Sequence, residues 1–319
     1  KSIRIDYLLS EERTFNDFNN DEIRFIHKIV FEVLRHKSKI DYYISQYYDG
    51  NFKKLLIKYK IILRIGVYQL FFMNSVPNYA AVNTTVDLCK IIDKSKVNLI
   101  NAMMRKLSNN IPKKDMMSDI SIKYSHPKWL IDKWLKKWSK DEVIKLLKWN
   151  NSEPEIWFRI NVLKTSIKEI YKFLNHENID FIENKILKEY FSTNSIQKIL
   201  QSKLMKEGLI SVQNPANGLV VKLLDPKPNE IIFDGCAAPG GKSAYIHELT
   251  NGDIKINSYD NNEKRIKVMK KNLKRLNINT IECHKSNLMI DSILNYKIGL
   301  IDVPCTGTGV ISKRIDIKW

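Results

Sequence analysis

A cysteine that follows an apolar run is the first feature of this sequence that could do chemistry. Residues 297–303, KIGLIDV, have the composition of a short strand, and Pro304 and Cys305 follow directly. A cysteine acts as a nucleophile or an acid–base group when a nearby cation or helix N-terminus lowers its pKa. A lone cysteine is more often an inert buried thiol, but the flanking proline and the turn TGTG predict that Cys305 is exposed. Cys305 and Asp302 are therefore candidate catalytic residues.

The segment DGCAAPGGKS, residues 234–243, is a second candidate site. It ends an apolar run and places small residues before a predicted helix. Small residues let a ligand approach the backbone, and a helix N-terminus favours negative groups. The spacing misses that of a phosphate-binding P-loop by one residue, because an extra glycine precedes Lys242, so a P-loop ATPase is a remote alternative. A glycine-capped helix without a ligand also stays open.

Asp260 ends the next β-rich run, KINSYD. An acidic residue after the second strand of a nucleotide-binding sheet commonly binds the ribose hydroxyls. The alternative is that Asp260 caps the following helix. Its spacing from the glycine loop, about one βα unit, favours the ribose interpretation.

These candidates need a scaffold that brings strand ends together. Four short β-rich runs alternate with helical segments, at residues 230–235, 255–260, 280–284 and 297–303. Strands that alternate with helices predict a parallel sheet built from βαβ units. Functional residues gather at the carboxyl ends of such strands, where the glycine loop, Asp260 and Asp302 all fall.

The first 110 residues have a different pattern, with apolar residues at helical spacing that predict an all-α region. Gly66 lies inside one predicted helix and suggests a close helix–helix approach, although a merely tolerated glycine is nearly as consistent. Residues 109–119 are polar, contain Pro112 and predict a linker. A small mixed α/β subdomain is expected after it.

Tryptophans alternate with lysines near the start of that subdomain, at positions 129, 134, 138 and 149. Aromatic and basic residues in this arrangement can stack on bases and bind phosphates. The alternative is an amphipathic helix whose tryptophan rings are buried. For the tryptophans we favour this alternative somewhat. The lysines can face RNA in either case.

The composition favours a polyanionic partner. The 319 residues carry a formal charge of +18 and are 44% hydrophobic. The electrostatic field of such a high positive charge favours nucleic acid as a partner. The abundance of Lys, Asn and Ile indicates that an AT-rich genome explains part of this charge.

The four cysteines form no CxxC pair, so we expect reduced thiols, no metal and a cytoplasmic location. No apolar stretch is long enough to predict a membrane span.

Together, DGCAAPGGK and DVPCTGTGV resemble the RNA 5-methylcytosine methyltransferases of the RsmB/Nop2/Sun family, which use S-adenosyl-L-methionine. EGLISVQNPANGLVVKLL is similar to the segment before the first strand in that family, and FRINVLKTS to its Arg-x-Asn subdomain. Residues 17–107 resemble the NusB-type helical domain at the N-terminus of bacterial RsmB. This architecture narrows the resemblance to the enzymes that methylate cytosine in small-subunit (16S) ribosomal RNA.

The resemblance implies a fold and a division into domains. It predicts an all-α NusB-like RNA-binding domain at 1–112, a small α/β subdomain at 120–206 and a Rossmann-like class I methyltransferase domain at 207–319. Only four of the family's seven strands fall within the sequence, so we expect a sheet truncated after the fourth strand. The expected partner is small-subunit ribosomal RNA, and the expected state is a monomer.

The resemblance also implies roles for individual residues. The residues that would bind the methionine and ribose portions of the cofactor are Cys236, Ala237, Ala238, Pro239, Gly240, Gly241 and Lys242. Asp260 would bind the ribose hydroxyls, and Asp302 would lie beside the cofactor and the target base. The family has an aspartate near the adenine where this sequence has Asn287. It also has Gln-Asp before the first strand where this sequence has Gln213 and Asn214.

In that family two cysteines share the reaction. A thiolate adds to carbon 6 of cytosine, carbon 5 then attacks the methyl group, and a base removes the proton from carbon 5 as the thiolate leaves. The resemblance gives the attack to a Thr-Cys-Ser motif and product release to Cys305. No Thr-Cys-Ser occurs in the sequence. We therefore expect a C-terminally truncated chain that does not complete the reaction alone.

Two alternatives stay open. Cys305 could itself be the nucleophile, as the Pro-Cys cysteine is in DNA cytosine methyltransferases. The chain could instead be a basic RNA-binding or assembly module with a vestigial sheet, which predicts salt-sensitive RNA binding that does not depend on a cofactor.

Overall fold

The computed structural model describes residues 5–12, 17–112, 117–291 and 296–319. The chain divides into two compact units. Unit 1 comprises Lys1–Glu153 and Thr306–Trp319, and unit 2 comprises Pro154–Cys305. The predicted boundaries near residues 112–120 and 206–207 do not coincide with this partition, and the three-domain division stays a prediction. Part of the predicted linker, residues 113–116, lies outside the described residues.

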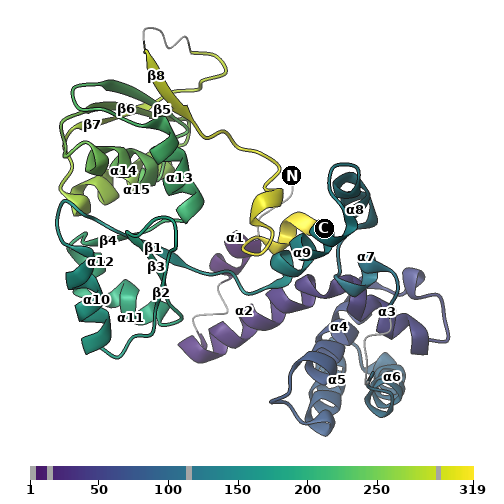
Figure 1. Ribbon diagram of the computed structural model, residues 1–319. Helices are drawn as coiled ribbons and strands as arrows, with labels where there is room; N and C mark the ends of the chain where they lie inside the picture. Colours follow the sequence, from purple (N-terminus) through teal and green to yellow (C-terminus); the bar gives the residue numbers. More distant parts are fainter. Residues whose placement is uncertain (1–4, 13–16, 113–116, 292–295) are drawn as a thin grey trace. The chain divides into compact units, whose positions relative to one another are not determined.

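Unit 2 contains a parallel sheet of four strands in the order β7-β6-β5-β8. The strands are β5 (Ile231–Gly235), β6 (Lys255–Asp260), β7 (Ile281–Lys285) and β8 (Ile298–Ile301). Figure 1 shows α14 (Gly241–Leu249) and α15 (Glu263–Leu276) on the same side of the sheet, as right-handed crossovers require. This arrangement confirms the predicted Rossmann-like fold class.

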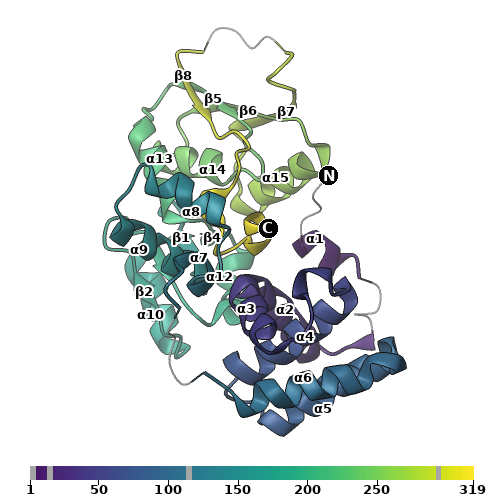
Figure 2. The same cartoon turned by 90° about the vertical axis from the view of Figure 1, so that its right-hand side faces the viewer.

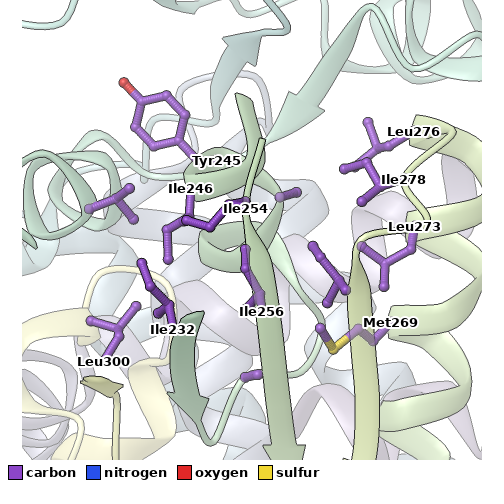
Figure 3. Packing of buried hydrophobic residues seen from close by; sticks show 14 of the residues in the cluster. Ile232, Tyr245, Ile246, Ile254, Ile256, Met269, Leu273, Leu276, Ile278 and Leu300 are labelled. Atoms are coloured by element: carbon purple, nitrogen blue, oxygen red, sulfur yellow. The ribbon is translucent and has the colours of Figure 1, made fainter. Parts of the chain in front are cut away.

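The core of this sheet lies between its strands and these two helices. Ile232, Ile256 and Leu300 extend from the strands toward Ile246 and Met269 of the helices (Figure 3). The three isoleucines are fully buried. Burial of such side chains contributes roughly 1.5–3 kcal/mol each, and it fixes the strand ends that carry the candidate site.

A second, antiparallel sheet of unit 2 has the order β2-β3-β1-β4. Its strands are β1 (Trp157–Ile160), β2 (Ile182–Glu183), β3 (Tyr190–Ser192) and β4 (Ile210–Val212). The helices around it are α10 (Ile167–His176), α11 (Ile196–Gln201) and α12 (Lys203–Lys206), and α13 (Pro215–Leu224) leads to the parallel sheet. A reciprocal capping box of Ser166 and Glu169 starts α10.

Unit 1 is helical apart from its loops, which confirms the predicted all-α N-terminus. Its helices are α1 (Ile5–Ser10), α2 (Asn20–Arg35), α3 (Lys37–Tyr47), α4 (Ile57–Phe72), α5 (Asn78–Ile92), α6 (Val97–Asn109), α7 (Ile120–Lys123), α8 (Lys128–Leu135) and α9 (Lys140–Asn151). Short 3-10 helices occur at η2 (Phe52–Lys54), η3 (Lys94–Lys96), η4 (Thr308–Val310) and η5 (Ile315–Lys318). Figure 2 shows α5 and α6 side by side, and α4 packs against both.

Gly66 permits this close packing. A Cβ atom built on Gly66 would lie 2.6 Å from Thr85 Oγ1 and 2.6 Å from Met104 Cε. A side chain there would push α5 and α6 away, so the predicted close approach is confirmed.

The segment after Cys305 is held within unit 1. Ile311 and Ile315 are fully buried against apolar residues of α8 and α9. The Lys318 ammonium is also buried and donates to Arg35 O (3.3 Å), Ser125 O (3.2 Å) and Asn151 Oδ1 (2.6 Å). Residues 311–318 therefore form part of the core of unit 1 despite their distance along the chain.

The tryptophans near α8 and α9 depart from the favoured expectation of buried rings. Trp134 is buried in the same apolar cluster. Trp129, Trp138 and Trp149 are instead 63%, 45% and 57% exposed. The expectation is wrong for these three, because only one face of α8 and of α9 meets the rest of unit 1 and because Trp138 lies in the turn between the two helices. In the part of the chain that the structure describes, no helix is both long and apolar enough to span a membrane.

Candidate active site

The site begins at the carboxyl end of β5, where Asp234 is buried. Its Oδ2 accepts a hydrogen bond of 2.5 Å from Ser243 Oγ at the start of α14. Ser243 also contacts Ser258 of β6, with 3.1 Å between the two hydroxyl oxygens. Burial raises the pKa of Asp234 to about 6, although the Ser243 hydrogen bond opposes this. This network joins β5, β6 and α14 beneath the glycine loop.

The loop between β5 and α14 makes tight turns that few residues allow. Cys236 has a left-handed φ of 59° and Gly240 a φ of 91°. A Cβ on Gly240 would lie 2.8 Å from Met269 Cγ of α15. The Ala237 amide donates to Tyr259 O (2.9 Å), which ties the loop to β6. The loop is therefore a backbone surface held against α15 and β6, and the cofactor-binding role of residues 236–242 stays a prediction.

Asp260 is buried beneath this loop and touches it. Its Oδ2 accepts from the Ala238 amide (3.2 Å), and its Oδ1 accepts from the Asn262 amide (2.9 Å). Asn262, not Asp260, caps α15, because the Asn262 side chain accepts from the Arg265 amide. The helix-cap alternative for Asp260 is therefore wrong.

Arg265 is a site residue that the sequence reading missed. Its guanidinium lies 3.2 Å from Asp260 Oδ2 and also donates to Ala238 O of the loop. Arg265 falls one helical turn after the Asn262 cap, on the first turn of α15. A basic residue at that spacing after an acidic strand end is the signal that could have indicated it.

Asn287 follows β7, and its side chain bonds within its own turn. Its Oδ1 accepts from the Met289 amide (3.2 Å), and its own amide donates to Asp291 Oδ2 (2.8 Å). The Ser286 amide donates to Asp260 O (3.1 Å), so this turn lies next to the second strand end. The structure thus places Asn287 at the same edge of the sheet as Asp260.

Asp302 follows β8 and meets the glycine loop. Its amide donates to Gly235 O (3.3 Å), and its carboxylate forms an ion pair with Lys242 at the start of α14. Asp302 is 59% exposed, so the pair opens to solvent. Cys305 is exposed as predicted, and it lies at most about 10 Å along the chain from Asp302.

The two cysteines of the site differ in character. Burial, and then the Asp260 carboxylate, raise the pKa of the Cys236 thiol above its ordinary value. Cys236 is therefore a neutral thiol at physiological pH and a poor nucleophile. This geometry suits Cys236 for shaping the loop and leaves Cys305 as the accessible thiol of the two.

A buried polar network supports the loop from behind. Arg159 of β1 donates to Glu248 Oε1 (2.7 Å), Gln213 Oε1 (2.5 Å) and Gly241 O (3.1 Å). Tyr190 Oη also donates to Gln213 Oε1 (2.7 Å). Two donors on Oε1 fix the orientation of the Gln213 amide, and its Nε2 is buried without a partner in the described structure. A Cβ on Gly241 would lie 3.4 Å from that Nε2.

The described residues include no group of three or more His, Cys, Asp or Glu side chains that could hold a metal ion. The charged groups of the site are instead engaged in the pairs given above, Lys242 with Asp302 and Arg265 with Asp260. The site thus combines a small-residue loop, buried carboxylates at strand ends and an exposed thiol.

Comparison with known proteins gives three matches along the chain. Residues 221–319 match the family described as 16S rRNA methyltransferase RsmB/F. Residues 3–109 match the NusB family, and residues 126–191 match the ferredoxin-like domain of RsmF/B-like methyltransferases.

Individual relatives agree with these matches. The "Probable ribosomal RNA small subunit methyltransferase B" of Synechocystis sp. is 31% identical over 308 residues, which cover 93% of this chain and 69% of the relative. The "Ribosomal RNA small subunit methyltransferase B" of Vibrio cholerae is 30% identical and covers 92% and 68%. The crystal structure of PH0851 has the same fold, with a TM-score of 0.73, 24% identity and coverage of 96% of this chain and 71% of that one. This chain belongs to the RsmB/F family of methyltransferases.

Proposed function

We propose that this protein transfers a methyl group from S-adenosyl-L-methionine to carbon 5 of a cytosine in small-subunit ribosomal RNA. Family membership and the names of the relatives support the reaction class and the RNA. The observation that carries the proposal is the ion pair of Lys242 with Asp302. It joins the glycine loop after β5 to the strand end that precedes Cys305.

The residues present fit this cofactor. The loop offers a backbone surface at Gly240 and Gly241 that a side chain would fill. The unpartnered Gln213 Nε2 beside Gly241 is a buried donor suited to a polar ligand atom. Asp260 is a buried carboxylate suited to a pair of ribose hydroxyls. When bound, S-adenosyl-L-methionine supplies an electrophilic methyl group on a sulfonium.

The same geometry suggests what the chain does for the target base. The Asp302 carboxylate can accept a hydrogen bond from the amino group of a cytosine. Lys242 holds that carboxylate at the end of β8. The target base has to leave its stack to reach these groups. We assign Asp302 to orienting the base and Lys242 to positioning Asp302.

The covalent part of the proposal requires a second thiol. A cysteine thiolate forms a bond to carbon 6, and carbon 5 then takes the methyl group. A base removes the proton from carbon 5, and the bond between sulfur and carbon 6 breaks. The attacking cysteine of the family lies in a Thr-Cys-Ser motif, which these 319 residues do not contain. We therefore assign product release to Cys305 and propose that these residues alone do not complete the transfer.

The test uses the complete protein with labelled cofactor and small-subunit ribosomal RNA, and bisulfite sequencing of the product. We expect methylation at cytosine carbon 5. Absence of methyl transfer to any RNA would reject the proposal. Cys305→Ala tests the role of this thiol: accumulation of a covalent RNA adduct supports release by Cys305. Loss of every adduct would instead make Cys305 the nucleophile.

A basic RNA-binding module without catalysis is the second candidate, and the charge of +18 favours it. Calorimetry with S-adenosylhomocysteine distinguishes the two candidate functions, because a module with a vestigial sheet would not bind this compound.

Three further predictions stay untested. They are the domain division at 1–112, 120–206 and 207–319, the monomeric state and the cytoplasmic location.

A further inference from the structure

Three tryptophans of unit 1 point into solvent close together in the sequence. Trp129 in α8, Trp138 in the following turn and Trp149 in α9 are 63%, 45% and 57% exposed. They are half of the chain's six tryptophans. Trp134 and the buried residues Val143 and Leu147 already pack these helices against unit 1. The three rings are therefore largely open to solvent, and each leaves a face on which a flat ligand group can stack.

Seven exposed lysines accompany these rings. They are Lys128, Lys133, Lys136, Lys137, Lys140, Lys145 and Lys148. Within the described residues none of the seven has a carboxylate within 4.0 Å, although Asp132, Asp141 and Glu142 lie on the same helices. The Glu142 carboxylate does interact electrostatically with Lys145, and Asp119 with Lys128. The seven lysines nevertheless outnumber the three carboxylates of residues 128–149, and this excess of positive charge favours an anionic partner.

The spacing places lysines beside the rings. Lys133 follows Trp129 by four residues, and Lys145 precedes Trp149 by four residues. Residues four apart on a helix are neighbours on one face. Trp138 follows two lysines in the turn between α8 and α9. Each exposed ring therefore has an ammonium group within reach of the same ligand.

We propose that this tryptophan–lysine surface, formed by the three exposed tryptophans and seven exposed lysines of residues 128–149, binds a single-stranded segment of the substrate RNA. The rings stack on unpaired bases and the lysines contact phosphates, which is the chemistry that single-stranded nucleic acids require. This inference rests on the proposed function, which makes RNA the substrate. The surface lies in unit 1, so it is distinct from the methyl-transfer site of unit 2.

The experiment measures fluorescence anisotropy of a labelled 12-nucleotide single strand of small-subunit ribosomal RNA and of its duplex, with the 319-residue chain. We expect the single strand to bind more tightly. Trp129→Leu/Trp149→Leu should weaken its binding at least tenfold, because loss of one stacked base costs roughly 5-fold to more than 100-fold. The phenylalanine variants at the same positions should retain most of the affinity, because they keep an aromatic face.

Two matched controls separate the role of this surface from the loss of any exposed aromatic ring or of any pair of lysine charges. Tyr79→Leu removes an aromatic ring of α5 that is 72% exposed, and it should leave RNA binding unchanged. Lys94→Ala/Lys96→Ala removes two charges from η3, and it should weaken binding less than Lys133→Ala/Lys145→Ala. Circular dichroism verifies that each variant is folded, and the single variant Trp129→Leu replaces the double variant if the latter is not.

Several outcomes would overturn the proposal. Equal binding of single strand and duplex, or leucine variants that bind like the wild type, would leave only general electrostatic attraction. Tryptophan-dependent binding to vesicles with anionic lipids, without binding to RNA, would assign the surface to a membrane. Methyl transfer by the complete protein is measured separately, so failure of this surface and failure of the proposed function are distinguishable.

Discussion

Arg159 in unit 2 and Lys318 in unit 1 are both buried cations, and their hydrogen-bond partners differ. In unit 2, Arg159 pairs with the Glu248 carboxylate, and both side chains are almost fully buried. In unit 1, Lys318 is equally buried, but its partners are two backbone carbonyls and the Asn151 amide oxygen. Burial therefore lowers the pKa of Lys318 to about 7, and the nearby Arg35 lowers it further. A buried cation with a counter-charge forms a pair in which the loss of either partner is costly, whereas a buried cation without one makes its segment sensitive to pH.

The largest loss of stability is expected when the buried ion pair of Arg159 with Glu248 is broken. Arg159→Met leaves the Glu248 carboxylate buried and unpaired, and such losses cost about 3–5 kcal/mol. Hydrogen exchange of peptides from β1 and α14 measures the change in local unfolding free energy. The double variant Arg159→Met/Glu248→Leu should recover most of the loss. A single variant as stable as the wild type would contradict this account of unit 2.

A pair of glycines gives the next comparison. Gly240→Ala forces a left-handed φ of 91° on alanine, at a cost of roughly 1–2 kcal/mol, and places its Cβ against Met269. Calorimetry with S-adenosylhomocysteine should show weaker binding by about tenfold or more. Gly309→Ala in unit 1 is the control, because nothing lies within 4 Å of its Cβ position. If both substitutions weakened S-adenosylhomocysteine binding equally, the conformation of the loop at Gly240 would have no special role in binding.

Lys318 should make the C-terminal segment more stable as the pH rises. Between about pH 7 and pH 10.5 the unfolded chain binds a proton that the folded chain lacks, so the free energy of unfolding increases by up to about 1.4 kcal/mol per pH unit. His126 does not contribute in this range, because burial lowers its pKa to about 3. Exchange protection of residues 311–319, corrected for intrinsic rates, should rise from pH 7.5 to 8.5.

Lys318→Met should abolish this pH dependence, since methionine does not titrate. Lys313→Met, at an exposed lysine five residues before Lys318, is the control and should preserve most of the pH dependence. An unchanged slope in Lys318→Met would assign the titration to another group.

The smallest effect on stability is expected at the exposed ion pair. Asp302→Asn should change the unfolding free energy of unit 2 by only about 0.2–1 kcal/mol, because water screens a carboxylate that is 59% exposed. The same variant of the complete protein should lose methyl transfer if Asp302 orients the base. A large loss of stability would instead make this pair a structural counterpart of Arg159 and Glu248.

The sequence by itself determined the local features of this protein. The alternation of β-rich runs and helices predicted the parallel sheet, and the glycines after Asp234 predicted the turn before α14. Gly66 indicated the close helix contact that the structure contains. Such features depend on periodicity and on backbone conformations that few residues allow, so they can be recognised without long-range contacts.

Tertiary structure decided which distant residues meet and which side chains are buried. Residues 311–318 complete the core of unit 1, and no local pattern indicates that contact. The spacing of Arg265 after an acidic strand end is a local signal, but the fold decides that its guanidinium meets Asp260 beneath the loop. The four tryptophans of residues 129–149 show the same limit: one is buried and three are exposed, although all four lie among lysines. Burial depends on which helix face meets the rest of the unit, and packing between elements far apart in the chain sets that face.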